Sequence, residues 1–412
     1  MPRLSRLREE LSFVRGNLLV LIVSWVFFRF VGSMVYPYES LYLEALGASA
    51  FIIGLLGALS TLALFFSRLV GGYLADKYGR RDLIVAMTFG VALSYAFYAL
   101  APDWKLVAIG MVVANLCLVY QPALQAITAD SIPPEKRGLG YALANVIPGI
   151  SALFSPFVAR ALIYRYGFVE GMRVAYWITV AGCLMAALIR AFFLEETLEE
   201  KAKMEIRELL SEVKKSVSEM LKAVRQMPRE LKVFTVILFI SIFEEPMFHM
   251  FMSLYAVHVV GIGRADWAVL NVVWSATALA VGIPLGKAVD VMGRKRALVL
   301  SYLLWIPSTV FFIISKSFLD LLIIFVVFSL GASFFGPAEQ ALVADLTPKE
   351  LRGRVMAAIG NLNLVAAACA SVIAGFLYQL NPVMPFLTCV FIDILVLTLI
   401  LLFLREPAVR EA

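Results

Sequence analysis

The amino-acid sequence predicts an all-α membrane protein with twelve transmembrane helices. Three observations predict this class. Hydrophobic residues make up 61% of the chain and charged residues only 16%, whereas charged residues make up about 25% of soluble proteins. The apolar residues gather in twelve runs. A membrane-spanning helix needs roughly 20 consecutive, mostly apolar residues, and the runs have about this length. Only short polar segments separate these runs, so 412 residues hold the spans and little else.

The predicted spans follow one another at short intervals. They cover residues 17–38, 49–75, 82–101, 104–130, 138–163, 173–194, 231–260, 267–291, 297–315, 319–345, 355–378 and 383–404. Each run is long enough to cross the hydrocarbon core as a helix, which satisfies its own backbone hydrogen bonds. The segment before the first run has no small-residue cleavage site. We therefore expect the first span to remain in the mature protein.

Lysine and arginine predict the orientation, because cytoplasmic loops are enriched in both. With the N-terminus inside, the external loops carry only a few of the 36 Lys and Arg residues: Lys105, Arg165, Arg173, Arg264 and Lys316. We expect an integral plasma (inner) membrane protein with both termini in the cytoplasm. The same asymmetry accounts for the net charge of +6, so we expect no nucleic-acid partner.

The longest polar stretch divides the chain into two halves of six spans. We predict an N-terminal bundle at 1–194, a cytoplasmic linker at 195–230 and a C-terminal bundle at 231–412. Within the linker, apolar residues recur at helical spacing among charges: Ile206, Leu209, Leu210, Val213, Val217, Met220, Leu221 and Val224. This pattern indicates an amphipathic helix along the membrane surface or under the helix ends. We expect it to connect the halves without an activity of its own.

The two halves also resemble each other in sequence. Residues 122–142 match residues 337–357, and residues 72–81 match residues 286–295. The spacing between the matched segments differs by only one residue in the two comparisons. The first match preserves these positions: Pro122, Ala123, Gln125, Ala126, Ala129, Asp130, Pro133, Glu135, Arg137 and Gly138. The chain is therefore predicted to be a duplicated six-helix unit, with both copies in the same orientation.

The first copy of the loop, GGYLADKYGRR at 71–81, resembles the signature loop of the major facilitator superfamily, in particular of its drug/proton antiporters. The resemblance covers the number of spans, the central linker and both repeats. It implies two pseudo-symmetric six-helix bundles and alternating-access transport of a small organic solute. It also implies protons and membrane lipids as partners, a monomer, and neither a cofactor nor a metal.

The signature loops supply candidate gate residues. Gly79 allows a tight turn, and a carboxylate such as Asp76 can stabilise a helix N-terminus. In the resembled family this cluster latches the cytoplasmic ends of the two halves together. The resemblance extends the role to these residues: Asp76, Arg80, Arg81, Asp130, Arg137, Asp290, Arg294, Asp345 and Arg352. The alternative is that these charges only anchor the loops at the lipid headgroups.

Charged residues in the middle of spans are costly, so they are candidates for function. Arg29 lies midway along the first span, and Glu244 and Glu245 lie midway along the seventh, its counterpart. Glu245 and His249 are four residues apart and share a helix face, and Pro246 should interrupt the helix. We predict that Glu244, Glu245 and His249 carry protons and that Arg29 is a counter-ion or substrate contact. The alternative is a static buried ion pair.

Further candidates for substrate binding are other polar, charged or aromatic residues within the spans. With Arg29 they form this set: Tyr36, Asn115, Gln121, Gln125, Phe248, Glu339 and Asn361. Asn361 and Asn363 on the eleventh span are either polar groups of the cavity or interhelical contacts. Arg160 and Arg190 lie near span ends, from which long side chains reach the headgroups. Asp393 lies midway along the last span, and the sequence suggests no role for it.

We expect proton-coupled export of amphipathic, drug-like compounds. Two departures from the exporter pattern leave the direction open. Gly110 stands where many proton-coupled exporters have an arginine, and residues 155–160 keep only part of an exporter element on the fifth span. Proton-coupled uptake of an organic acid or sugar, lipid or lysolipid movement, and a non-transporting receptor or scaffold remain alternatives. The sequence contains no metalloprotease, serine-hydrolase or ATP-binding loop motif, so we do not expect an enzyme.

Overall fold

The computed structural model describes residues 10–198, 206–348 and 351–405, and these residues form helices without strands. Both chain ends, which the charge distribution predicts to be cytoplasmic, lie outside the described residues. Part of the predicted linker, residues 199–205, also lies outside them. The rest of the linker contains the amphipathic helix α10 (Ile206–Gln226).

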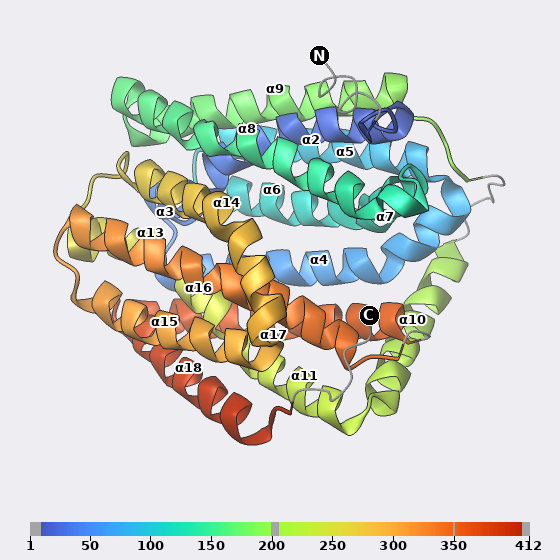
Figure 1. Cartoon of the computed structure of the whole chain (residues 1–412). Coiled ribbons are helices and arrows are strands. Elements are labelled where there is room, and N and C mark those ends of the chain that lie inside the picture. Colours follow the sequence, from blue (N-terminus) through green and yellow to red (C-terminus); the bar gives the residue numbers. More distant parts are fainter. Residues whose placement is uncertain (1–9, 199–205, 349–350, 406–412) are drawn as a thin grey trace, which may run out of the picture. The chain divides into compact units, whose positions relative to one another are not determined.

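The helices follow the predicted spans closely (Figure 1). In the first half they are α2 (Gly16–Val35), η1 (Tyr36–Tyr38), α3 (Glu39–Ala45), α4 (Ala50–Tyr78), α5 (Arg80–Ala99), α6 (Trp104–Cys117), η2 (Leu118–Tyr120), α7 (Gln121–Asp130), η3 (Pro134–Lys136), α8 (Arg137–Tyr166) and α9 (Phe168–Phe193). In the second half they are α11 (Arg229–Ser241), α12 (Glu244–His249), α13 (Met252–Tyr255), η4 (Ala256–Val260), α14 (Trp267–Met292), α15 (Arg294–Ile314), α16 (Phe318–Asp345), α17 (Arg352–Leu380) and α18 (Met384–Phe403).

Eleven of the twelve predicted spans are long, apolar helical segments within the described residues. The exception is the seventh, residues 231–260, which is divided among α11, α12, α13 and the π-helical η4. The first break, at residues 242–243, directly precedes α12. Pro246 has no N–H to bond the carbonyl of Ile242, and its ring crowds that carbonyl. The predicted interruption is therefore present, just before the proline.

The helices group into two compact units. Unit 1 contains Met1–Tyr36 and Phe66–Lys214, and unit 2 contains Pro37–Phe65 and Lys215–Ala412. The first part of α4 thus belongs with the second-half helices, whereas its last part belongs with the first-half helices. These units cut across the predicted boundaries at 194 and 231.

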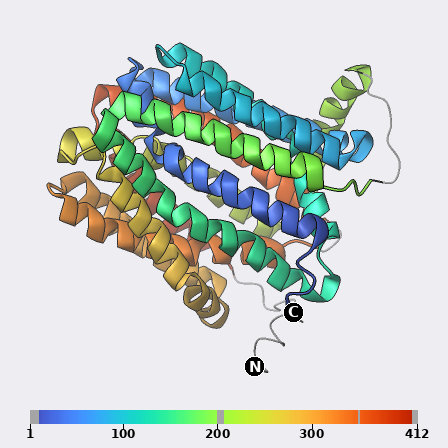
Figure 2. The same cartoon turned by 90° about the horizontal axis from the view of Figure 1, so that it is seen from above.

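In unit 1 the long helix α2 lies between α8 and α9, and α5 packs against α6 and α9 (Figures 1 and 2). Apolar side chains from α2, α5 and α7 meet in one buried cluster, which includes Leu21, Ile84, Val91 and Ile127. In unit 2, α16 packs against both α14 and α15, and α18 packs against α11, α12 and α15. Figure 1 shows α15 next to α16 and α18.

A close backbone contact joins α4 to α17 within unit 2. A Cβ atom added to Gly54 would lie 2.8 Å from the Cα atom of Gly375, a separation that real side chains do not tolerate. Small residues at such crossings let helices in membranes approach closely and pack. The two glycines therefore hold the first part of α4 against α17.

A polar cluster lies at the end of unit 2 that contains α3 and η4. Glu44 accepts a hydrogen bond across 2.8 Å from Nε2 of His258, and a nitrogen of Arg264 lies 3.7 Å from the same carboxylate oxygen. The indole of Trp267 donates to the carbonyl of Pro37 at 2.8 Å. These contacts tie the loop after the first span to the ends of the broken seventh span and of α14.

Unit 1 contains a fully buried arginine, Arg190 on α9. Its guanidinium donates to the hydroxyls of Ser24 at 3.0 Å and Thr88 at 2.8 Å. It also lies over the rings of Phe28 and Tyr120, at 4.9 and 5.7 Å from their centroids. The prediction that Arg190 reaches the headgroups is therefore wrong, because neighbouring helices supply hydroxyl and aromatic partners inside the bundle.

Candidate functional site

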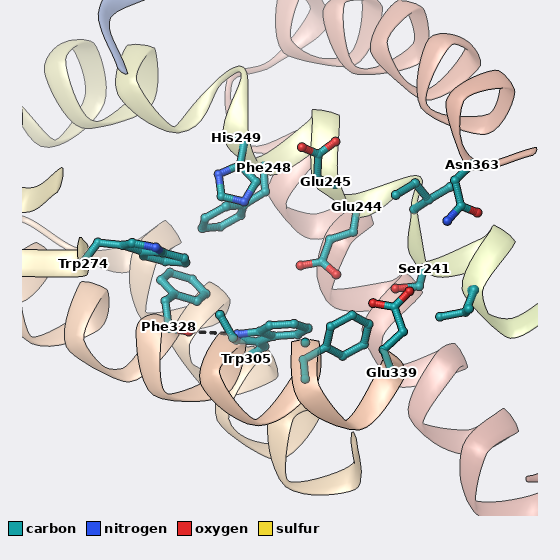
Figure 3. A pocket seen from close by; sticks show the side chains of 15 residues that line it. Ser241, Glu244, Glu245, Phe248, His249, Trp274, Trp305, Phe328, Glu339 and Asn363 are labelled. Carbon is teal, nitrogen blue, oxygen red and sulfur yellow. Dashed lines mark hydrogen bonds between the residues drawn. The ribbon is translucent and has the colours of Figure 1, made fainter. Parts of the chain in front are cut away.

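The candidate site is a cavity of about 280 Å³ in unit 2 (Figure 3). Side chains of the broken seventh span form one side of it, and those of α14, α15, α16 and α17 form the rest. The lining residues are Leu238, Ser241, Ile242, Glu244, Glu245, Phe248, His249, Trp274, Trp305, Phe328, Ala332, Phe335, Gly336, Glu339 and Asn363. Aromatic walls with a few converging polar groups are typical of small-molecule sites.

Three carboxyl groups line the cavity. Figure 3 shows Glu244 directed toward Glu339 and Ser241, whereas Glu245 points to the opposite side. Adjacent residues in a helix are about 100° apart, which explains why the two glutamates diverge although both border the cavity. His249 follows Glu245 by one turn and also lines the cavity. All three predicted proton carriers thus lie together, and Glu339 joins them from α16.

Aromatic side chains form much of the rest of the lining. The indole of Trp305 donates to the carbonyl of Phe328 at 3.2 Å, so its plane is held in place (Figure 3). The ring of Phe328 meets that of Phe248 edge to face, with centroids 4.7 Å apart, and Trp274 lies 6.1 Å from the imidazole of His249. Such fixed rings present flat apolar surfaces to a bound molecule. Of these residues, the sequence predicted only Phe248 and His249.

Behind Glu244, α18 contributes Asp393, for which the sequence suggested no role. Asp393 has no exposed surface, and its carboxyl group faces that of Glu244 within hydrogen-bonding reach. The hydroxyl of Tyr302 on α15, which is bonded to Ser241 at 2.9 Å, interacts electrostatically with both acids. No sequence pattern linked positions 244 and 393, because only the packing of α12 on α18 brings them together.

The other predicted substrate contacts do not border this cavity. Arg29, Tyr36 and Gln125 are exposed, and Gln121 is half-buried; all four belong to unit 1. The amide of Asn115, also in unit 1, donates to the carbonyl of Met111 in its own helix at 2.9 Å. The pairing of Arg29 with the glutamates therefore stays a prediction.

On α17, the residue at the cavity is Asn363 rather than Asn361. Residues two apart on a helix face nearly opposite sides, which explains why only one of the two asparagines reaches the cavity. The sequence singled out both residues, and of the two only Asn363 lines this cavity. Asn361 is half-buried elsewhere on the helix.

The first signature loop forms an ion pair and a helix cap in unit 1. Arg80 pairs with Asp130 at the end of α7. Arg81 instead donates to the backbone carbonyls of Leu194 and Ala191, at 2.7 and 2.6 Å. Glu196, which the sequence did not single out, accepts the backbone N–H groups of both arginines at 3.1 and 3.3 Å. This carboxylate satisfies N–H groups that the first turn of α5 leaves unbonded.

The second copy of the loop resembles the first. The guanidinium of Arg294 lies 3.2 Å from Asp345 at the end of α16 and 4.0 Å from Asp290. Arg352 donates to the carbonyl of Ala344 at 2.9 Å. Asp76 and Arg137 are exposed in unit 1. In each half, the arginine of the signature loop therefore pairs with an aspartate at the end of a later helix: Arg80 with Asp130, and Arg294 with Asp345.

The sequence profile of the Major Facilitator Superfamily matches residues 21–282 and 234–412, which together span almost the whole chain. The chain belongs to this superfamily of transporters. The resemblance inferred from the loop motif and the twelve-helix prediction are therefore confirmed, and the protein is an integral membrane transporter.

Two relatives of this transporter carry different functional names. One is a multi-drug resistance efflux pump PmrA homolog from Lactococcus lactis, 26% identical over 381 residues, which cover 87% of this chain and 88% of the relative. The other is a Na(+), Li(+), K(+)/H(+) antiporter from Planococcus maritimus, 31% identical over 174 residues. That alignment covers 40% of this chain and 39% of the antiporter.

Solved structures of superfamily members share the fold of this transporter. The human organic anion transporter MFSD10 (TETRAN) is 18% identical with a TM-score of 0.65, covering 93% of this chain and 98% of its own. A POT family transporter in complex with 5-aminolevulinic acid is 14% identical with a TM-score of 0.74, covering 94% and 95%. At these identities the similarity concerns the fold alone.

Proposed function

We propose that the protein exports small amphipathic organic compounds in exchange for protons. The observation that carries the proposal is the composition of the cavity in unit 2, whose lining combines fixed aromatic rings with the acids Glu244, Glu245 and Glu339. Aromatic walls bind apolar parts of varied compounds by contact area. The acids and His249 are groups that can take up and release protons.

Relatives support this proposal. The PmrA homolog, similar over most of its length, is named as a multi-drug efflux pump. The Planococcus protein is named as a cation/proton antiporter. Its similarity favours a second candidate, exchange of a monovalent cation for protons, in which the same carboxylates would serve both ions. Both candidates share proton coupling at the acids of the cavity.

The proposal includes the membrane arrangement and the gates. Both termini lie in the cytoplasm of the inner membrane, and the protein acts as a monomer. The pairs Arg80–Asp130 and Arg294–Asp345 belong to the cytoplasmic latches, together with Asp76, Arg81, Arg137, Asp290 and Arg352. Support comes from the repetition of the pair in both halves. Arg29 is proposed to contact the substrate.

The test uses purified protein in liposomes with an imposed pH gradient. In liposomes where the cytoplasmic face of the protein points to the outside medium, we expect the pH gradient to drive uptake of cationic amphipathic dyes. We expect Glu244→Gln or Glu245→Gln to make dye uptake independent of the gradient. Glu230→Gln is the matched control, since this exposed glutamate lies in the first turn of α11, away from the cavity lining. Parallel liposomes receive Na⁺, Li⁺ or K⁺ instead of the dye.

Each outcome decides between the candidates. Dye flux that follows the pH gradient in the wild type and in Glu230→Gln, and is lost in the cavity variants, supports drug export. Cation flux without dye flux supports the second candidate. Flux of a dye or cation that ignores the gradient, or coupling that survives in the double variant Glu244→Gln/Glu245→Gln, refutes proton coupling at these acids.

A further inference from the structure

Asp393 is a buried acid without a donor. The side chain has no exposed surface, and neither of its carboxyl oxygens receives a hydrogen bond from any donor in the described part of the chain. A buried charge without a partner is strongly unfavourable. This side chain therefore requires a ligand or a proton that satisfies its oxygens.

The group that faces Asp393 is the carboxyl of Glu244, within hydrogen-bonding reach. An ionised carboxylate can only accept hydrogen bonds, so two of them cannot bond each other. One proton between the two groups resolves the conflict, since the protonated acid donates to the other. Glu244 lines the cavity and Asp393 does not, so the pair connects the cavity to the interior of unit 2.

The surroundings of the pair favour a proton over a metal ion. The titratable groups that interact electrostatically with the pair are Glu245, Cys389 on α18, and Tyr302. Tyr302 also interacts with Glu339. None of them is a cation. Among the described residues, no three metal-ligating side chains converge on one point. The two carboxyl groups offer four oxygens at most, fewer than the roughly six to eight oxygen ligands of Ca²⁺ or the roughly six of octahedral Mg²⁺.

The helix that holds Glu244 is a short segment of the broken seventh span. The helix α12 has only six residues, between breaks at residues 242–243 and 250–251. It packs against α17 and α18, and the thiol of Cys389 contacts the carbonyl of Glu244 at 3.8 Å. A short helix between two breaks can shift with little rearrangement of its neighbours, as hinges do.

We propose that Glu244 and Asp393 form a single proton site whose occupancy sets the position of α12 against α18. A proton from the water of the cavity binds the Glu244 carboxylate and is shared with Asp393, with no other bond made or broken. Its release to the cavity leaves two facing carboxylates, whose repulsion separates α12 from α18. This inference rests on the proposed proton-coupled transport and assigns Asp393 as the positioning partner of the coupling residue.

The test is infrared spectroscopy of the purified full-length protein in H₂O and D₂O at neutral pH. The wild type should show the isotope-sensitive carbonyl stretch of a protonated carboxylic acid. Asp393→Asn and Glu244→Gln should each abolish this band, because the amide donates to the remaining carboxylate and allows it to ionise. The double variant should lose no more intensity than either single variant. Glu230→Gln should leave the band unchanged.

The swap variant Glu244→Asp/Asp393→Glu keeps both carboxyl groups and should retain the band, which separates loss of the pair from misfolding. A band that persists in either single variant, or losses that add in the double variant, would overturn the shared site. The spectra need no substrate, so they stand apart from the liposome assay. If the band behaves as expected but flux ignores the gradient, the proton site is correct and the proposed function is wrong.

Discussion

Replacing Thr88 by Val should destabilise unit 1 by about 1.5–3 kcal/mol, although the two side chains have nearly the same shape. The Thr88 hydroxyl donates to the carbonyl of Ile84 at 2.6 Å and accepts from the guanidinium of Arg190 at 2.8 Å. The variant leaves one N–H of a buried cation without its acceptor. Hydrogen bonds to charged groups contribute about 1.5–3 kcal/mol, which sets the expected loss.

Thr179→Val is the matched control. Thr179 is equally buried, and within the described parts of the chain its hydroxyl bonds only the carbonyl of Ala175 in its own helix, at 2.9 Å. Removing that hydroxyl frees a carbonyl that already bonds within the helix, so its cost should be small. The difference between the variants therefore isolates the hydrogen bond to Arg190.

Thermal unfolding of the purified protein in detergent measures the difference. For a unit of this size, about 2–4 °C accompany each kcal/mol, so Thr88→Val should melt roughly 3–12 °C below Thr179→Val. Equal midpoints for the two variants would refute the reasoning. The aromatic rings of Phe28 and Tyr120 would then satisfy the guanidinium without Thr88.

Three further predictions concern unit 2. Pro246→Ala restores a backbone N–H, so α11 should continue into α12. Dye flux should then fall several-fold, while dye affinity, measured by equilibrium binding, stays unchanged. Equal flux in the variant and the wild type would argue against a hinge at the break before α12. Gly375→Ala places a methyl group against α4 near Gly54 and should cost about 1–3 kcal/mol in thermal stability; an unchanged midpoint would contradict that close contact. Glu44→Gln breaks a half-exposed ion cluster, so it should cost less than about 1 kcal/mol, and high salt should erase the difference; a larger, salt-independent loss would show that the cluster is structural.

Most of the fold could be predicted from the sequence, because each span is a local property. A run of apolar residues such as 318–345 forms a helix whatever its neighbours are, since the bilayer leaves no other way to satisfy the backbone. Pro246 likewise predicted a break from chemistry within one turn. The repeat at 122–142 and 337–357 then predicted the duplication, and the signature loop predicted the superfamily.

The site was predicted mainly where charge made residues conspicuous. Glu244, Glu245, His249 and Glu339 stand out in apolar spans and do line the cavity. Trp274 and Trp305 have no such signal, because an indole facing a cavity and one facing lipid have the same apolar neighbours in sequence. Their roles depend on how α14 and α15 are rotated, which the weak amphipathicity of buried membrane helices does not specify.

By itself, the sequence determined the number of helices, their duplication, the superfamily and the acids available for proton coupling. The tertiary structure alone decided what those acids face. Asp393 could not be assigned from its surroundings in the chain, and Arg190 was expected at the headgroups. Packing placed the first against Glu244 and the second among hydroxyls and aromatic rings. The physical reason is the distance along the chain over which each effect acts. Backbone hydrogen bonding and hydrophobicity act within one helix, whereas the partner of a buried charge comes from helices distant in sequence.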